Sequence, residues 1–132
     1  MAHQDEVPEL IHHKAWISQD ENVRIHYVTA GTGDKTMLLI HGAPQTWYAW
    51  RRMIKPLTMA GYKLIIPDYR GAGSSSKPTA GYDKWTMAQD LHELVHTHLE
   101  VREPVAVVGH DVGSMVASAY ACLLYTSDAA DE

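Results

Sequence analysis

The run of residues 104–117, PVAVVGHDVGSMVA, constrains the fold of this chain more than any other segment. Its β-branched stretch, Val105–Val108, predicts a fully buried strand, and the small apolar residues that follow predict a helix. The two elements must meet in a sharp turn, because Gly109 and Gly113 flank Asp111 at two residues on either side and leave room for a strained backbone. We therefore expect a strand–turn–helix unit that pushes the side chain of Asp111 out to where a substrate can reach it.

Asp111 stands where a serine would indicate an esterase. A carboxylate is ionised at neutral pH, so it can attack an electrophilic carbon without a base to activate it. The chemistry predicted from this residue is alkylation of the aspartate, followed by hydrolysis of the resulting ester. The structural alternative is that Asp111 only caps the helix that follows, a position at which aspartate is favoured.

Composition and charge exclude several classes of protein. The 132 residues suffice for one modest domain, and 45% hydrophobic with 20% charged residues is typical of a soluble globular protein. The net charge of −5 gives no reason to expect nucleic acid or an anionic membrane as a partner. We find no apolar run of membrane-spanning length and no signal-peptide pattern at the start. A single cysteine, Cys122, rules out a disulfide framework, so we expect a cytoplasmic location.

Predicted strands and helices alternate along the chain. Strands are expected at 14–18, 23–28, 37–40, 63–67 and 105–108, and helices at 47–59, at 84–99 after an Asp83 cap, and after residue 113. This order predicts an α/β fold with a mainly parallel sheet and helices on both faces. In such sheets ligands bind beyond the carboxyl ends of the strands. Residues 41–44, 68–76 and Asp111 all follow predicted strands, so we expect them along one edge.

Three motifs carry a family resemblance: H-G-A-P at 41–44, D-Y-R-G-A-G-S at 68–74 and G-H-D-V-G at 109–113. In this order and spacing they resemble the α/β-hydrolase superfamily, within it the branch of epoxide hydrolases and haloalkane dehalogenases, over residues 23–121. The resemblance implies that Asp111 is the nucleophile and that the backbone N–H groups of Ala43 and Val112 form an oxyanion hole. It also implies a cis peptide bond before Pro44. The other motif residues that support these loops are His41, Gly42, Pro44, Gly109, His110 and Gly113.

Residues 43 and 112 bear on the branch of the family. Haloalkane dehalogenases typically have Asn and Trp at these places, whose N–H groups hold the departing halide. Ala43 and Val112 have no side-chain donor, whereas epoxide hydrolases stabilise the leaving alkoxide with tyrosines of a later cap domain. The resemblance thus implies a small-molecule epoxide as substrate and no metal or cofactor. A haloalkane or haloacid dehalogenase with the same aspartate is the alternative.

The chain resembles only the N-terminal part of such an enzyme. In the family, the cap domain, the histidine that activates water, its acid partner and the last strands all come later. Residues 122–132 match the translation of a transposase-type sequencing adapter at every position, so we expect the native domain to be 1–121. A core that stops here leaves the strand before Asp111 unpaired on one side. We therefore expect the chain to be inactive as a hydrolase, forming at most the first covalent bond, and to be poorly soluble or partly unfolded. A non-catalytic fragment that associates through this edge is the alternative from another class.

Several histidines suggest other chemistry. Residues 92–96, HELVH, match the zinc-protease pattern H-E-x-x-H. We predict no metal here, because a third ligand is not evident and the face that carries His92 and His96 is expected to point to solvent. His41 and His110 are expected to make structural hydrogen bonds rather than to act as bases.

Overall fold

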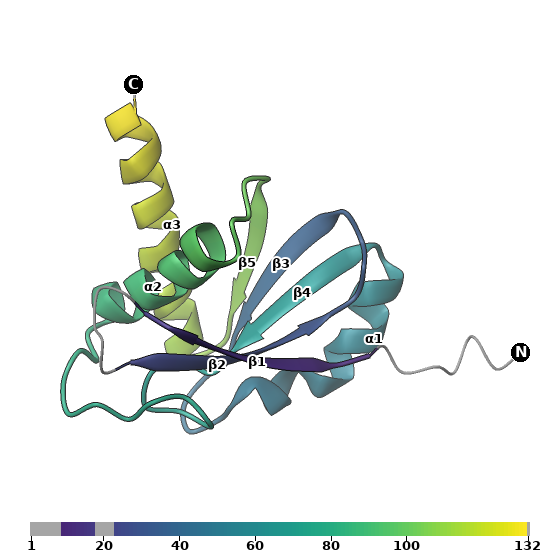
Figure 1. The fold of residues 1–132 in the computed structure, drawn as a ribbon, viewed down its shortest axis with the longest axis horizontal. Coiled ribbons are helices and arrows are strands. Elements are labelled where there is room, and N and C mark those ends of the chain that lie inside the picture. The colour runs from purple at the N-terminus through teal and green to yellow at the C-terminus, as the bar shows by residue number, and fades with distance from the viewer. Residues whose placement is uncertain (1–8, 18–22, 132) are drawn as a thin grey trace, which may run out of the picture.

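The structure of this chain is a computed structural model, and it describes residues 9–17 and 23–131 (Figure 1). Residue 18, the end of the first predicted strand, lies outside the described part. The elements in chain order are β1 (Ile11–Trp16), β2 (Arg24–Ala30), β3 (Lys35–Ile40), η2 (Trp47–Trp50), α1 (Arg51–Met59), β4 (Tyr62–Pro67), α2 (Lys84–His92), η3 (Glu93–His98), β5 (Val105–Gly109) and α3 (Val112–Asp131).

The five strands form one sheet in the order β1-β2-β4-β3-β5. β3 lies parallel to both β4 and β5, while β2 is antiparallel to β1 and to β4. Four strands therefore run in one direction and only β2 runs against them. This confirms the predicted α/β fold with a mainly parallel sheet.

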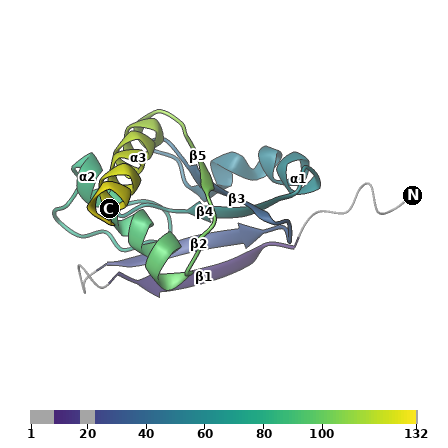
Figure 2. The same ribbon diagram turned by 90° about the horizontal axis from the view of Figure 1, so that it is seen from above.

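Helices cover both faces of the sheet, as predicted, and each face has its own apolar core. The strand period of two sends Leu64 and Ile66 of β4 to one face and Ile65 to the other. On the first face they meet Ile54 of α1. On the second, Ile65 belongs to a cluster that includes Leu91 of α2. Each such fully buried side chain contributes about 1.5–3 kcal/mol. Figures 1 and 2 show α1 apart from the pair formed by α2 and α3.

β5 differs from its prediction. Its residues alternate between half-buried and exposed, and Val108 is 38% exposed, so the expectation of a fully buried strand was wrong. Val105 and Val107 pack into the core beside α3, but Ala106 and Val108 face the side on which α1 lies and are left uncovered. Within the described sheet β5 is an outer strand whose only neighbour is β3.

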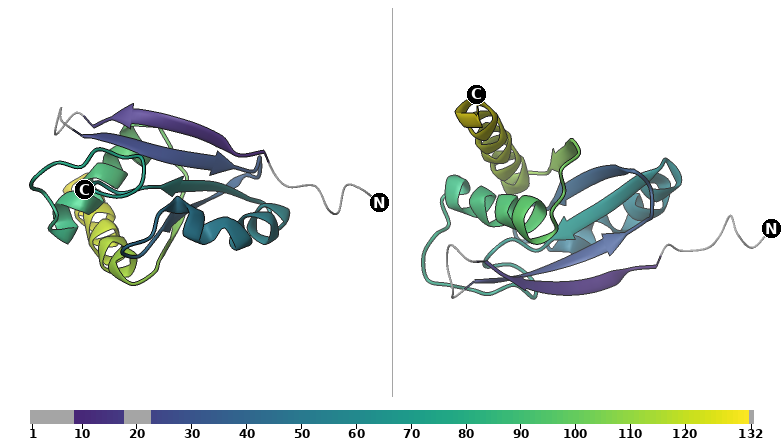
Figure 3. Two further views of the ribbon diagram at one scale, coloured as in Figure 1. Left: turned by 90° about the horizontal axis from the view of Figure 1, so that it is seen from below. Right: turned by 45° about the horizontal axis from the view of Figure 1, so that its top comes forward.

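The helices begin close to their predicted residues but change type along their length. The segment predicted as one helix over 47–59 starts as the 3₁₀ turn η2 and continues as α1. Asp83 caps α2 as predicted, because its carboxylate accepts the backbone N–H of Thr86 at 2.9 Å. The following turns widen to π-helical η3, where the Leu99 N–H bonds the carbonyl of Leu94 at 2.9 Å. α3 extends well past the sheet (Figure 3).

Of the helices within residues 9–17 and 23–131, none has both the length and the apolar character needed to cross a membrane.

Candidate active site

The junction of β5 and α3 is a sharp bend centred on Asp111. This residue has φ = +56°, in the left-handed region that L-residues avoid at a cost of about 1–2 kcal/mol. Its side chain is exposed, and its carboxylate accepts no hydrogen bond from any described residue. The Ser114 N–H instead bonds the backbone carbonyl of Asp111 at 2.9 Å. The side chain therefore does not act as the helix cap of the structural alternative.

Glycines permit this bend because backbone atoms occupy the space of a Cβ. A Cβ at Gly109 would collide with the carbonyl of Gly113. A Cβ at Gly113 would in turn collide with the carbonyl oxygens of Ile40 and His41, where β3 ends. The bend is thus packed tightly against the end of β3, and the flanking positions require glycine.

The loop after β3 lies directly against the bend. A Cβ on Gly42 would stand only 2.8 Å from the Cβ of Asp111. The Ala43–Pro44 peptide bond is cis, as the resemblance implies. The loop turns back at once, since the Gln45 N–H bonds the carbonyl of Gly42 at 2.9 Å. We call residues 42–46 the oxyanion loop, after the role that the resemblance implies for Ala43.

Both predicted oxyanion donors therefore lie at the same edge of the sheet as Asp111. Ala43 is exposed and follows the glycine that contacts the bend. Val112 is the first residue of α3, so a helix of this geometry leaves its N–H without an intrahelical partner. Backbone N–H groups in this situation can hold a negatively charged oxygen.

Asp68, directly after β4, connects its own loop with β2 and with the residue that follows the oxyanion loop. Its side chain is 1% exposed, and its two oxygens accept the backbone N–H of Trp47 at 2.8 Å and that of Ser74 at 3.1 Å. Its Oδ2 also bonds Nδ1 of His26 on β2 at 2.8 Å. The motif at 68–74 pointed to this carboxylate, but nothing in the sequence pairs it with a histidine so far away along the chain.

His41 makes the structural hydrogen bond expected of it. The ring is fully buried, its Nδ1 donates to the Gly42 carbonyl at 2.8 Å, and it stacks on Tyr69 with ring centroids 4.0 Å apart. Burial lowers the pKa of His41, against the opposing effects of that hydrogen bond and of the charge of Asp68. Burial, and then the charge of Asp111, raises the pKa of Tyr69. Two stacked, buried rings thus pack behind the edge of the sheet that carries Asp111.

His110 departs from its expected role. Its ring is exposed and forms no hydrogen bond with the described residues, so the predicted structural hydrogen bond is wrong. The side chain turns away from the bend toward α1. There it lines a cavity of about 280 Å³ together with Gln45, Ala49, Trp50 and Met53.

His92 and His96 of the H-E-x-x-H pattern were predicted to point to solvent. This prediction is wrong, because both side chains face α3. Tyr120 of that helix bonds Nε2 of His96 at 2.6 Å, and Nδ1 of His96 bonds the Val101 carbonyl at 3.0 Å. Burial, and then the proximity of His96, lowers the pKa of His92. Burial raises the pKa of Tyr120. No set of three or more potential His, Cys, Asp or Glu metal ligands is gathered anywhere in the described residues.

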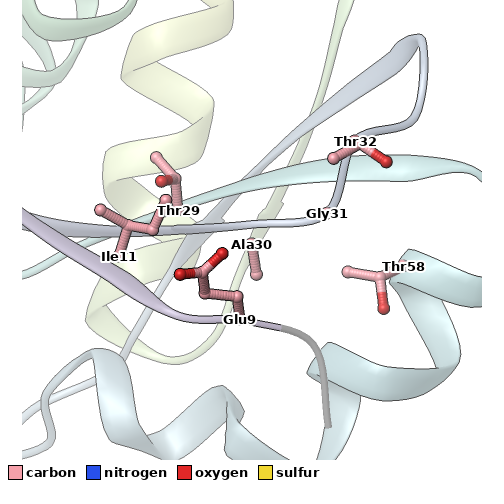
Figure 4. Close-up of a pocket in the computed structure, with 7 residues that line it drawn as sticks. All are labelled: Glu9, Ile11, Thr29, Ala30, Gly31, Thr32 and Thr58. Carbon is pink, nitrogen blue, oxygen red and sulfur yellow. The ribbon is translucent and has the colours of Figure 1, made fainter. Parts of the chain in front are cut away.

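A cavity of about 320 Å³ lies at the opposite edge of the sheet (Figure 4). It is lined by Glu9, Ile11, residues 29–32 and Thr58. Because β2 runs against the other strands, its last residue, Ala30, lies at the edge away from Asp111. This cavity is therefore separate from the candidate active site.

Comparison with known proteins agrees with the geometry. Residues 35–128 match the model of the alpha/beta hydrolase fold family, and the chain belongs to that family. It is 48% identical over 113 residues to the soluble epoxide hydrolase of Corynebacterium sp. (strain C12), covering 86% of this chain and 37% of that protein.

Solved structures give the same picture. The epoxide hydrolase CorEH, solved without ligand, superposes with a TM-score of 0.76 at 47% identity, over 86% of this chain and 38% of that one. An epoxide hydrolase of Vigna radiata superposes with a TM-score of 0.76 at 31% identity, over 87% of this chain and 36% of that one. The chain thus spans little more than a third of the length of these relatives.

Proposed function

We propose that this chain carries the nucleophile of an epoxide hydrolase. The Asp111 carboxylate attacks one epoxide carbon, the carbon–oxygen bond of the ring breaks, and the released alkoxide oxygen takes up a proton. Water then cleaves the resulting hydroxyalkyl ester and leaves a diol and the free carboxylate. The observation that carries the proposal is the exposed, unbonded carboxylate of Asp111, held at a left-handed bend beside the oxyanion loop.

The backbone amides of Ala43 and Val112 have the second role in this proposal. When water attacks the ester, the carbonyl oxygen of Asp111 becomes an oxyanion. Two N–H donors fixed in place before the reaction stabilise that charge, and losing one such donor typically costs about 3–4 kcal/mol of activation free energy. The names of the relatives, which are epoxide hydrolases, support the choice of substrate class.

Neither histidine beside Asp111 is placed to activate the hydrolytic water. His41 is buried with Nδ1 bonded to a carbonyl, and His110 turns toward α1. We propose that the water-activating residues belong to the part of the enzyme that this chain does not span. The chain by itself then stops at the ester, which accumulates.

This accumulation gives a direct test. After incubation with styrene oxide, peptide mass spectrometry should find one epoxide equivalent on the peptide that contains Asp111, and none on the Asp111→Asn variant. Asp34, an exposed aspartate in the turn before β3, serves as the control: Asp34→Asn should label like the unchanged chain.

Three outcomes would count against the proposal. Equal labelling of Asp111→Asn, or labelling spread over many carboxylates, would show that the reaction is not directed by the bend. Absence of any labelling would favour a non-catalytic chain. Faster labelling by a chloroalkane of similar size would favour the dehalogenase alternative.

A further inference from the structure

Three polar side chains form a continuous hydrogen-bonded line on the α1 face of the sheet. Nδ1 of His12 on β1 lies 2.9 Å from Nε2 of His26 on β2, and Nδ1 of His26 lies 2.8 Å from Oδ2 of Asp68. His26 and Asp68 are 5% and 1% exposed, whereas His12 is exposed. The line therefore connects solvent at an edge strand with a buried carboxylate.

The chemistry of the groups limits how many protons this line can hold. An ionised carboxylate only accepts, so Nδ1 of His26 carries a hydrogen. The contact between the two rings needs one hydrogen, supplied by either nitrogen. It therefore survives when both rings are neutral or when one is protonated. It cannot survive when both are cations, because two N–H groups would then face each other.

The same carboxylate holds the end of the oxyanion loop. Oδ1 of Asp68 accepts the N–H of Trp47, the residue that follows the loop. The ring of Trp47 also stands edge-on to the ring of His12, with centroids 5.3 Å apart. Trp47 thus contacts both ends of the line, because its backbone N–H bonds Asp68 and its ring packs against His12.

We propose that His26 and Asp68 are positioning residues for the oxyanion loop, and that His12 makes their hold on it dependent on pH. At neutral pH the line is intact and Trp47 is fixed. In acid the second proton breaks the contact between the histidines, and the ring of His12 moves away from Trp47. The functional meaning rests on the proposed role of Ala43, but the structural link does not.

Several cationic side chains of the described residues lie on this face, and the anionic Glu9 lines the cavity beside Ala30 and Thr58. Lys14 lies directly across from His26 in the β1–β2 register, and Arg24 lies on the same face beneath Trp16. Arg51, Arg52 and Lys55 of α1 line the neighbouring cavity of about 370 Å³ together with Trp47. Asp68, at the buried end of the line, is an anion in direct contact with His26.

The first test is spectroscopic and uses the whole chain labelled with ¹⁵N-histidine. A scalar coupling through the hydrogen bond between Nδ1 of His12 and Nε2 of His26 is expected at neutral pH and should vanish on acidification. His12→Phe should abolish it. His13, which points to the opposite face and bonds Thr29, provides the matched control: His13→Phe should retain it. Absence of the coupling in the unchanged chain at neutral pH would overturn the proposal.

The second test follows the loop itself. The backbone amide signals of Ala43 and Trp47 should shift on acidification in step with the loss of the histidine coupling, and they should not shift in that way in His12→Phe. Signals that move equally in the variant would reject the link. Because this readout needs no epoxide, it separates failure of the link from failure of the proposed function, which the labelling of Asp111 tests.

Discussion

At the scale of single residues, Asp111 is a site of backbone strain. Asp111 adopts a left-handed backbone without being glycine, and its side chain forms no compensating hydrogen bond with described residues. Strained residues of this kind persist where the surrounding packing fixes them, and here Gly109 and Gly113 are locked between β3 and α3. The conformation exposes a reactive group at the expense of stability.

Because of this strain, the usual stability advantage of alanine over glycine should be reversed at residue 111. Asp111→Gly should be more stable than Asp111→Ala by about 1 kcal/mol, because only glycine adopts positive φ freely. Ser118, exposed in the middle of α3, is the control. There alanine should exceed glycine by about 1 kcal/mol, the ordinary helix preference. Urea unfolding of the four variants measures both differences. If alanine were more stable than glycine at both positions, the backbone of Asp111 would not be strained.

What the sequence could predict at this scale depended on local geometry. The glycine spacing around Asp111 predicts the bend, because the steric requirement lies within five neighbouring residues. The orientation of His96 was not predictable, since it is set by Tyr120, which lies 24 residues away. The same holds for His26 and Asp68, which are 42 residues apart. The oxyanion roles of Ala43 and Val112 remain predictions from the resemblance.

Among the elements, α2 is fastened to the loop after β4 by a buried ion pair. Arg70 donates from Nε and Nη2 to the two carboxylate oxygens of Asp90, at 2.6 and 2.8 Å. The two side chains are 2% and 0% exposed. A third donor of Arg70 bonds the Ala80 carbonyl at 3.1 Å. The pair therefore fixes the glycine- and serine-rich loop between β4 and α2 against the helix.

Replacing one member of this ion pair should lower the free energy of unfolding more than replacing both members. Arg70→Met removes the ion pair with Arg70 from the buried carboxylate of Asp90 and should lower the free energy of unfolding by about 3–5 kcal/mol. The double variant Arg70→Met/Asp90→Leu should recover a large part of that loss. Arg102→Met, at an exposed arginine, should change stability by less than about 0.5 kcal/mol. Denaturant unfolding checks the series. A double variant as unstable as the single one would contradict the explanation.

Two elements show which structural features a hydrophobic pattern predicts and which it does not. The pattern of 105–108 identified a strand correctly, but burial on both faces needs neighbours that the pattern does not contain. α1 packs against β3 and β4, and alternate residues of β5 remain exposed. The segment at 47–59 likewise reads as one helix, although the Asp68 bond to the Trp47 N–H fixes its first turn from outside.

For the whole molecule, the position of β5 at the end of the described sheet predicts association between copies of the chain. A strand with one free edge and no charged side chain is a template for pairing with another copy. We expect the chain to self-associate with increasing concentration. Val108→Lys, at an exposed position of β5, should reduce this association. Met59→Lys, at an apolar residue that is even more exposed at the end of α1, should not.

Sedimentation equilibrium over a range of concentrations distinguishes these cases. A chain that stays monomeric and melts in one sharp transition would contradict the expected role of the edge. Equal effects of the two lysines would indicate general solubility rather than pairing through β5.

The glycine framework around the bend and the side chain of residue 111 have separate roles. Gly42, Gly109 and Gly113 are confined by main-chain atoms or by the bend itself, whereas the side chain of residue 111 projects freely. The shape of the bend and the proposed chemistry therefore depend on different positions. Replacing the side chain of residue 111 would change the proposed attacking group and leave the scaffold intact.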